Sequence, residues 1–310
     1  MSKLISIIIP VFNHAHTIER CLKSITEQTY RPFEVIVVND GSTDELEPVL
    51  RKIENEIEDG TNQIPPHHRT EAGSRSRRDR GVQGGVGSIS LKVIDQPNQG
   101  AAAARNRGFK EAKGEYVIFW DADTVGKPGM LGRLVEALER NPQASYAYSQ
   151  FKFGWKKFRC QNFNAEDLKK NNYIDTTSLI RREALNTPST VLPLSSRGGP
   201  ALGGNGGGNE KHRVVSLALS PVRGETQRGV SGPFDESLAR FQDWDLWLTL
   251  LEQNKTGTFV PEVLYTKIVQ GRKGMSSWLP IFFYQLFDHS QKVLEFKKAR
   301  QVILKKHHIL

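Results

Sequence analysis

Residues 5–38 of this chain read ISIIIPVFNHAHTIERCLKSITEQTYRPFEVIVV and indicate how the chain begins to fold. Residues 5–10 are rich in apolar, β-branched side chains, as expected for a strand that is covered on both faces, and residues 33–38 repeat this composition. Between the two runs, apolar side chains recur at the spacing of one helical face, at Ile18, Cys21, Leu22 and Ile25. The stretch therefore predicts a β-α-β unit, in which a helix connects two parallel strands.

The same alternation continues to residue 141. Asp44 and Glu47 are spaced as a capping box, which predicts the start of a second helix running to about Glu58. Further elements are expected at 91–94 and 116–120 (strands) and at 101–112 and 131–138 (helices). This order predicts an α/β fold, with a mostly parallel central sheet and helices on both faces. In such sheets, ligands bind beyond the carboxyl ends of the strands.

Two stretches interrupt this pattern. Residues 61–90 and 187–230 are rich in Gly, Ser, Pro and Arg and lack periodicity, so we expect low-complexity insertions that form long loops. Residues 277–310 combine aromatic and basic side chains, which predicts a basic amphipathic tail. We therefore expect one domain over residues 1–276, interrupted by the two insertions and followed by the tail.

The charge of the chain is unevenly distributed. The 310 residues include 43 Lys and Arg against 34 Asp and Glu, a formal net charge of +9. The two insertions and the tail hold this whole excess, and the charges of the remaining segments nearly cancel when they are added together. The charge therefore favours peripheral contact with anionic lipid over a nucleic-acid-binding cleft.

The cysteine content and the first residues bear on the compartment. Cys21 and Cys160 are too few for a disulfide framework, which favours a reducing environment. The apolar run at 4–12 is short, contains Pro10 and lacks a cleavage site, so we interpret it as a strand rather than a signal peptide. No apolar run reaches the roughly 18 residues that a membrane-spanning helix requires. We expect a cytoplasmic protein, with peripheral contact to the cytoplasmic face of a membrane.

A pair of carboxylates, Asp121 and Asp123, directly follows the expected strand at 116–120. The end of a strand in an open α/β sheet presents its loop to the ligand crevice. Two hard oxygen ligands there suit Mg²⁺ or Mn²⁺ shared with a diphosphate. The alternative is a solvated turn, because Asp-x-Asp pairs are common in turns.

Two more segments end strands in a similar way. Residues 40–44, DGSTD, follow the second strand, where Asp40 and backbone N–H groups can face a nucleotide. Residues 97–108 enter a helix of very small residues, and Arg105 in it offers a fork of donors to phosphate. A helix cap and an ordinary Ala-rich helix are the alternatives for these two segments.

With these motifs the chain resembles a family, the inverting glycosyltransferases of family 2, which have the nucleotide-sugar-binding GT-A fold. The resemblance rests on motifs that occur in the family's order: IIIPVFN at 7–13, VVNDGSTD at 37–44, NQGAAAARNRG at 98–108, GEYVIFWDAD at 114–123 and QDWD at 242–245. It covers roughly residues 3–60, 91–186 and 231–276.

The resemblance implies a nucleotide-sugar site. Pro10 and Val11 would border the base, Asp40 would hydrogen-bond the nucleoside, Arg105 would lie close to the donor, and Asp121 would contact the ribose or the metal.

It also implies a metal ligand and a catalytic base. Asp123, helped by Asp121, would ligate Mn²⁺ or Mg²⁺, and Asp243 matches the acidic position of the base. The chain departs from the family at Gln242, where Glu is usual, and at Asn39, where Asp is frequent. Gln242 supplies hydrogen bonds but no charge.

The residues around Asp243 give a physical prediction of their own. Apolar side chains form one helical stripe, at Trp244, Trp247, Leu248 and Leu251. Asp243 and Asp245 flank this stripe near the helix start, where the helix dipole favours carboxylates whatever their role. Periodicity does not decide which of the two faces the cleft, and the resemblance favours Asp243.

Three other segments give weaker indications of function than these motifs. Aromatic and basic residues alternate over 151–159, which suits either nucleic acid or a loop near a phosphate-bearing acceptor. Residues 272–276 resemble the family's loop over the diphosphate, with a polar surface loop as the alternative. His307 and His308 lie in a terminal segment, and we expect both to be solvated.

Together these features predict an inverting glycosyltransferase that moves a sugar from a nucleoside diphosphate sugar to the hydroxyl of a carbohydrate or lipid-linked acceptor. Surface polysaccharide or glycolipid synthesis is the role implied by analogy. The alternatives are a nucleotidyltransferase, which would release pyrophosphate, and a catalytically silent nucleotide-sugar-binding protein. A nucleic-acid-binding module is disfavoured, because only the charge and the 151–159 segment suggest it.

Overall fold

The computed structural model describes residues 2–58, 69–71, 90–158, 160–186, 232–269 and 291–310. The chain divides into two compact units, residues 1–187 with 230–310 and residues 188–229. The second unit lies wholly outside the described residues, as do most of the insertion at 61–90 and the expected loop at 272–276. All of the described residues belong to the first unit.

The first part of the unit alternates strands and helices, as the sequence predicts. Its elements are β1 (Ile5–Val11), α1 (Ala15–Thr26), β2 (Phe33–Asp40), α2 (Leu46–Glu58), β3 (Arg69–Glu71), β4 (Ser90–Gln96), α3 (Ala101–Glu111), β5 (Tyr116–Phe119), β6 (Thr124–Gly126) and α4 (Met130–Arg140). The second part is more irregular, with β7 (Ala144–Phe153), β8 (Lys156–Lys157), α5 (Ala165–Lys170), β9 (Leu179–Arg181), α6 (Arg182–Leu185), α7 (Gln242–Glu252), β10 (Thr256–Lys267) and α9 (Gln291–Lys306).

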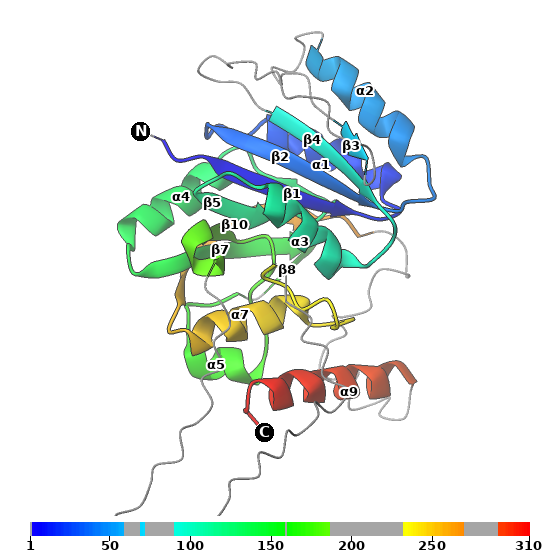
Figure 1. Ribbon diagram of the computed structural model, residues 1–310. Helices are drawn as coiled ribbons and strands as arrows, with labels where there is room; N and C mark the ends of the chain where they lie inside the picture. Colours follow the sequence, from blue (N-terminus) through cyan, green and yellow to red (C-terminus); the bar gives the residue numbers. More distant parts are fainter. Residues whose placement is uncertain (1, 59–68, 72–89, 159, 187–231, 270–290) are drawn as a thin grey trace, which may run out of the picture. The chain divides into compact units, whose positions relative to one another are not determined.

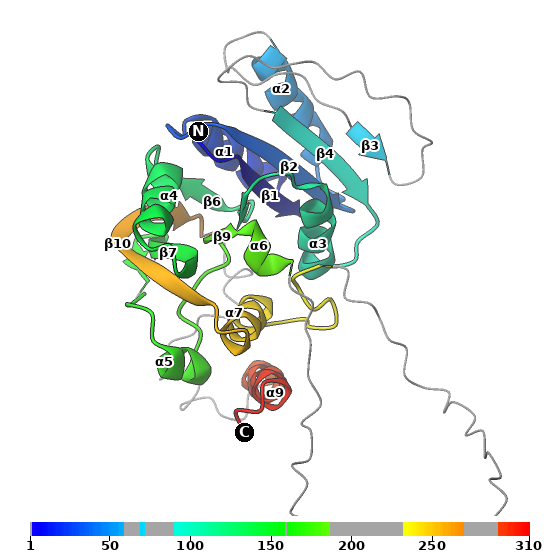
Figure 2. The same ribbon diagram turned by 60° about the vertical axis from the view of Figure 1, so that its left-hand side comes forward.

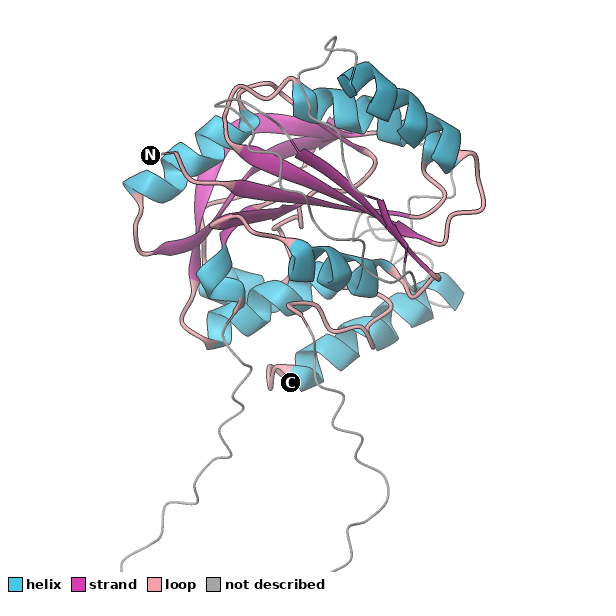
Figure 3. Cartoon of the chain, turned by 45° about the horizontal axis from the view of Figure 1, so that its top comes forward, coloured by secondary structure: helices cyan, strands magenta, loops and turns pink. Residues whose placement is uncertain are grey.

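The strands form one sheet in the order β3-β4-β2-β1-β5-β9-β7-β10-β6, and β8 pairs with β7. The strands from β3 to β5 are parallel, whereas β9 and β6 run antiparallel to their neighbours. Helices cover both faces of the sheet, α2 on one and α3 and α7 on the other (Figures 1 and 3). The predicted α/β architecture is confirmed, and the carboxyl ends of β1, β2 and β5 lie at one edge.

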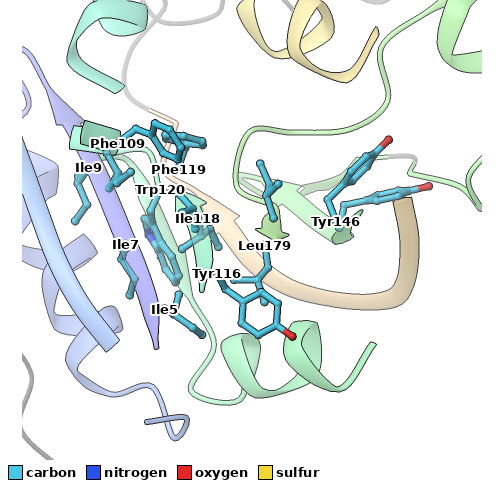
Figure 4. Packing of buried hydrophobic residues seen from close by; sticks show 14 of the residues in the cluster. Ile5, Ile7, Ile9, Phe109, Tyr116, Ile118, Phe119, Trp120, Tyr146 and Leu179 are labelled. Carbon is cyan, nitrogen blue, oxygen red and sulfur yellow. The ribbon is translucent and has the colours of Figure 1, made fainter. Parts of the chain in front are cut away.

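The core follows from the apolar strands. Alternate residues of β1 and the aromatic residues of β5 and α3 pack together in the interior (Figure 4). Each of these side chains is at most 9% exposed: Ile5, Ile7, Ile9, Phe109, Tyr116, Ile118, Phe119 and Trp120. Cys21 and Cys160 are buried and free, in agreement with the expected lack of a disulfide framework.

The capping role of Asp44 differs from the prediction. The second helix begins at Leu46, and Asp44 Oδ2 instead accepts a hydrogen bond of 2.8 Å from the backbone N–H of Ala15, the first residue of α1. The N-cap residue of α1, His14, makes no side-chain capping bond, so a carboxylate from another loop satisfies this helix start. The predicted capping box is therefore wrong, and Glu47 pairs with Arg51 instead.

The segment expected to be a basic tail contains the helix α9, which lies beside α7 (Figures 1 and 2). Its residues Ile303 and Leu304 are buried in the main core cluster. His307 is 9% exposed, and its ring nitrogens contact Asp245 and Glu252. The expectation that His307 is solvated is therefore wrong, because the buried carboxylate of Asp245 and the exposed carboxylate of Glu252, both on α7, bind its ring. His308 is exposed as expected.

The domain boundary at residue 276 stays a prediction, as does lipid contact by the tail. The basic residues Lys297, Lys298 and Lys305 are exposed, which agrees with an amphipathic helix. Within the described ranges, the structure contains no helix with both the length and the apolar character needed to span a bilayer.

Two helical glycines offer a matched test of how closely α3 packs on the sheet. A Cβ atom on Gly108 would lie 2.4 Å from Ile8 Cγ2 on β1, whereas one on Gly132 in α4 would meet no atom within 4 Å. Gly108→Ala should lower the free energy of unfolding by about 1–3 kcal/mol, because the overlap forces the helix away from the sheet. Gly132→Ala should be neutral or stabilise by up to about 1 kcal/mol. Urea denaturation of both variants checks this, and equal effects would contradict the close approach.

Candidate active site

A cavity of about 850 Å³ lies where the start of α3, the end of β5, the start of α7 and the end of β10 meet. This volume is in the upper part of the usual range for ligand pockets, about 300–1,000 Å³. Of the predicted site residues, Arg105, Asp121 and Asp243 line the cavity. Much of the rest of its wall is formed by Asn171, Asn172, Asp175, Thr176, residues 236–242 and Lys267.

Asp121 lies at the end of β5 between two cations. Its Oδ1 accepts from Arg105 Nη2 at 2.9 Å, and its Oδ2 accepts from Lys267 Nζ at 2.8 Å. Burial alone would raise the pKa of Asp121, but the charges of Lys267 and Arg105 outweigh it and hold the pKa well below its usual range. Asp121 is therefore a permanent anion that fixes two cations at the cavity.

Lys267 and Asp175 are site residues that the sequence reasoning missed. Lys267 Nζ lies 2.6 Å from Asp175 Oδ2, so the ammonium bridges two carboxylates. Burial lowers the pKa of Lys267, but the charges of Asp121, Asp175 and Asp123 raise it overall, which keeps the ammonium charged. The available signal was a lysine at the last position of β10, at the edge where ligands bind.

Asp123 has an oxygen available for a ligand. Its Oδ1 is buried and has no hydrogen-bond partner among the described residues. Burial raises the pKa of Asp123, the charge of Lys267 opposes this, and the charges of Asp121 and Asp175 reinforce it. An orphaned buried carboxylate oxygen is costly unless a cation or a donor completes it, so this atom fits the predicted metal ligand.

The described side chains offer fewer metal ligands than a site in which the protein alone surrounds the ion. Within the described ranges, no group of three or more His, Cys, Asp or Glu side chains is arranged to hold a metal ion. Both oxygens of Asp121 are engaged by cations. This composition suits Mg²⁺ or Mn²⁺ held by one or two carboxylates together with substrate phosphates, rather than a closed structural site.

Asp243 occupies the first turn of α7, in the cavity wall. Its Oδ2 accepts from Asn172 Nδ2 at 2.7 Å, and its Oδ1 accepts from the N–H of Trp244 at 2.9 Å. Burial, reinforced by the charge of Asp175, raises the pKa of Asp243 to about 6. The carboxylate is therefore oriented, ionised at neutral pH and more basic than an ordinary aspartate.

The structure separates the two carboxylates that periodicity left equivalent. Asp245 is 3% exposed and is not among the described residues that line the cavity. It instead binds Nζ of Lys306, the last residue of α9, at 2.7 Å and Nε2 of the next residue, His307, at 2.9 Å. Asp243 is thus the carboxylate of this pair that faces the cavity.

Gln242, the departure from the family pattern, contacts the same network. Its Oε1 accepts from Arg105 Nη1 at 2.9 Å, and its Nε2 donates to the carbonyl of Leu238. Arg105 therefore bridges Asp121 and Gln242. Because the amide is neutral, it holds the guanidinium without adding a further negative charge beside Asp243.

Asp40 is buried at the end of β2, with its oxygens already bonded. Its Oδ1 accepts from Gln96 Nε2 and from the N–H of Gln99, and its Oδ2 accepts from the N–H of Gly100, each at 2.8 Å. The carboxylate thereby fixes the loop before α3. Its contact with a nucleoside stays a prediction.

The other residues predicted to bind the nucleotide sugar lie at the carboxyl end of β1, next to that of β2. Pro10 and Val11 end β1 in register with Val38 and Asn39 of β2. In the described part of the chain, the cavity wall does not include them or Asp40 and Asp123. Their roles toward the base, the nucleoside and the metal likewise stay predictions.

The architecture is that of the GT-A glycosyltransferases. Over 92% of this chain and 64% of the other, it superposes on the structure of TarS from S. aureus in complex with UDP-GlcNAc, with a TM-score of 0.56 and 18% identity. It also resembles the mannosyltransferase PcManGT from Pyrobaculum calidifontis in complex with GDP-Man and Mn²⁺, with a TM-score of 0.52, 17% identity, and coverage of 90% and 60%. At these identities the likeness shows the fold.

The sequence comparison gives the family. The family described as Glycosyl transferase family 2 matches residues 6–83 and 80–191, and the chain belongs to it. An uncharacterized glycosyltransferase from Nostoc sp. is 33% identical over 135 residues, 44% of this chain and 33% of the relative. The uncharacterized glycosyltransferase EpsJ from Bacillus subtilis is 33% identical over 141 residues, 46% of this chain and 32% of the relative. The chain thus matches about a third of the length of these relatives.

Asp40 provides a test of how the loop before α3 is held. Asp40→Asn replaces an acceptor oxygen with an NH₂ group that faces N–H donors, so it should destabilise the fold by about 1–3 kcal/mol. Glu139→Gln, at an exposed acid near the end of α4, is the control and should change stability by less than about 0.5 kcal/mol. Chemical denaturation measures both, and a loss at Asp40 no larger than the control would contradict the role of this carboxylate.

Proposed function

We propose that the chain transfers a sugar from a nucleoside diphosphate sugar to an acceptor hydroxyl, with inversion at the anomeric carbon. The observation that carries the proposal is that Asp243, a carboxylate with a raised pKa, shares one cavity with the cations Arg105 and Lys267. Membership of glycosyltransferase family 2 and the nucleotide-sugar complexes of its structural neighbours support the same reaction.

The cationic side of the cavity suits the diphosphate. Arg105 and Lys267 are fixed by Asp121, so their charges are organised before a substrate arrives. Asp123, with Asp121, would hold Mn²⁺ or Mg²⁺, which supplies further positive charge to the leaving diphosphate. Arg105 and Lys267 hold the phosphates while the bond between the anomeric carbon and the diphosphate oxygen breaks, and the diphosphate keeps the electron pair.

The base suits the acceptor hydroxyl. As the acceptor oxygen bonds to the opposite face of the anomeric carbon, Asp243 takes up its proton. A carboxylate with a pKa of about 6 is ionised at pH 7 and still basic enough for this step. Asn172 orients the carboxylate through its hydrogen bond to Oδ2.

The wider role follows from family analogy and is part of the proposal. We propose that the donor is a UDP or GDP sugar, because structural neighbours contain UDP-GlcNAc and GDP-Man. The acceptor would belong to surface polysaccharide or glycolipid synthesis at the cytoplasmic face of a membrane, with the basic tail contacting anionic lipid. A relative at 29% identity over 127 residues is the cholesterol galactosyltransferase of Borreliella burgdorferi, which supports a glycolipid product.

The alternatives differ in their products. A nucleotidyltransferase would release pyrophosphate, whereas the proposed reaction releases a nucleoside diphosphate. A catalytically silent nucleotide-sugar-binding protein would bind donors without turnover. A neutral Gln242, where the family usually has Glu, would agree with a silent protein, but its contact with Arg105 gives Gln242 a binding role that is compatible with activity.

The pH dependence tests the base. Because Asp243 must be deprotonated to accept the proton, kcat/KM should be constant above pH 7 and fall about tenfold per pH unit below an apparent pKa near 6. Asp243→Asn should lower turnover by about 10²- to 10⁴-fold, with donor affinity unchanged in calorimetry. Glu166→Gln, at an exposed acid on α5, should keep the wild-type profile. Substantial turnover by Asp243→Asn would remove this residue from the mechanism.

Donor binding tests the metal ligand. Asp123→Ala should weaken calorimetric binding of the nucleotide sugar at least tenfold in the presence of Mn²⁺, because the carboxylate with the free oxygen is lost. In EDTA, the wild type and the variant should bind the donor equally weakly. If the affinity in Mn²⁺ is the same for both, Asp123 is not a metal ligand.

A further inference from the structure

The C-terminal helix α9 is fixed to α7, the helix of the proposed base, by charged side chains around the buried Asp245. Asp245 of α7 accepts from His307 and binds Lys306, whose Nζ also lies 2.7 Å from Asp235 Oδ2. The second ring nitrogen of His307, Nδ1, lies 2.8 Å from Glu252. A buried carboxylate needs such partners, so α7 and the end of α9 depend on each other.

Apolar contacts hold α9 along the rest of its length. Val293, Ile303 and Leu304 are each at most 3% exposed. Nearer its start, Phe296 packs edge-on against Phe241, the residue before α7, with the ring centroids 5.1 Å apart. The helix is therefore anchored at both ends and is not a free tail.

The same helix contributes to the wall of the catalytic cavity through Phe296 and Arg300. These residues are four apart and lie on one face of the helix. Arg300 Nη2 donates to the carbonyl of Lys170 at 2.9 Å, and its guanidinium lies 5.8 Å from the ring centre of Trp244. Lys170 directly precedes Asn171 and Asn172, and Asn172 holds Asp243. The α9 residues are thus connected to the base, through residues 170–172 and 241.

The chemistry of this wall matches a saccharide. A sugar ring has a C–H face that packs on an aromatic ring and a rim of hydroxyls that donate and accept hydrogen bonds. The wall offers the ring of Phe296, the guanidinium of Arg300, and the amides of Asn171 and Asn172. A lipid chain would need a continuous apolar lining, and a nucleic acid would need a run of cations.

We propose that α9 forms the acceptor-binding wall of the cavity, in which Phe296 packs on a sugar ring of a saccharide acceptor and Arg300 binds its polar rim beside Asp243. This proposal rests on the proposed glycosyl transfer and names its acceptor class. Phe296 and Arg300 are then determinants of acceptor specificity, in a segment that follows the motifs of the family resemblance.

The test compares acceptor kinetics with donor binding. The donor is the UDP or GDP sugar that stabilises the full-length protein most in a thermal-shift screen with Mn²⁺. The acceptor probes are 4-nitrophenyl glycosides of neutral hexoses, N-acetylhexosamines and uronic acids, with products detected by mass spectrometry. The variants are Phe296→Leu and Arg300→Ala, with Phe296→Tyr and Arg300→Lys as conservative partners. Leu294→Ala and Val302→Ala are the controls on the same helix, at side chains that are 46% and 51% exposed.

We expect the wild type to glycosylate at least one glycoside. Phe296→Leu and Arg300→Ala should raise the KM for that acceptor at least tenfold, with donor affinity in calorimetry within twofold of the wild type. Phe296→Tyr, which keeps the ring, should restore most of the acceptor affinity, and the two controls should match the wild type. The uronic acid and neutral glycosides show whether Arg300 binds a carboxylate or hydroxyls.

Results that differ from these would contradict either the proposed function or the proposed role of α9. If no nucleotide sugar binds to the wild type, the proposed function fails and this inference fails with it. If donors bind and are hydrolysed but no glycoside is glycosylated, the saccharide class is wrong while the proposed function stands. If glycosides are glycosylated and the acceptor KM is unchanged in both Phe296→Leu and Arg300→Ala, α9 is not the acceptor wall. A loss confined to kcat or to thermal stability would likewise assign α9 a structural role alone.

Discussion

Asp121 lies at the end of β5 with a cation on each carboxylate oxygen, and the cavity depends on this arrangement. Taking charges out of water is costly unless each one is paired, and removing one partner of a buried pair leaves the other uncompensated. Arg105 comes from α3 and Lys267 from β10, while Asp175 binds the same lysine from the loop before β9. One group of charges therefore ties together four separate parts of the chain, and it forms only when the sheet is complete.

This constraint organises the cavity into regions of different chemistry. Asp121 and Asp175 hold Arg105 and Lys267 in fixed positions, which preorganises the two cations for the proposed binding of the diphosphate. The proposed base, Asp243, lies in a different environment, where burial and the nearby charge of Asp175 raise its pKa to about 6. Asp245, two residues later, instead holds α9 through Lys306 and His307. Two carboxylates of one helix thus have different roles, since Asp243 faces the cavity and Asp245 attaches the C-terminal helix.

The alternation from β1 to α4 could be predicted from the sequence, because buried parallel strands and amphipathic helices leave strong periodic signals. Asp40 and Asp121, the carboxylates at or just after strand ends, could also be identified from the sequence. The cation at Lys267 was not, because it lies 146 positions from Asp121 and its role arises only when β10 returns to the sheet. Periodicity likewise could not separate Asp243 from Asp245, since the choice depends on α9. His307 was misjudged for the same reason, because its carboxylate partners belong to a different helix.

In the proposed reaction, one cavity brings a nucleoside diphosphate sugar and an acceptor hydroxyl together on opposite faces of the anomeric carbon. Proton NMR of the reaction catalysed by the wild-type chain tests this directly, because the coupling constant of the anomeric proton reports the configuration of the transferred sugar. We expect a product with the anomeric configuration inverted relative to the donor, formed together with one equivalent of free nucleoside diphosphate. Retention of configuration, or release of pyrophosphate, would contradict it.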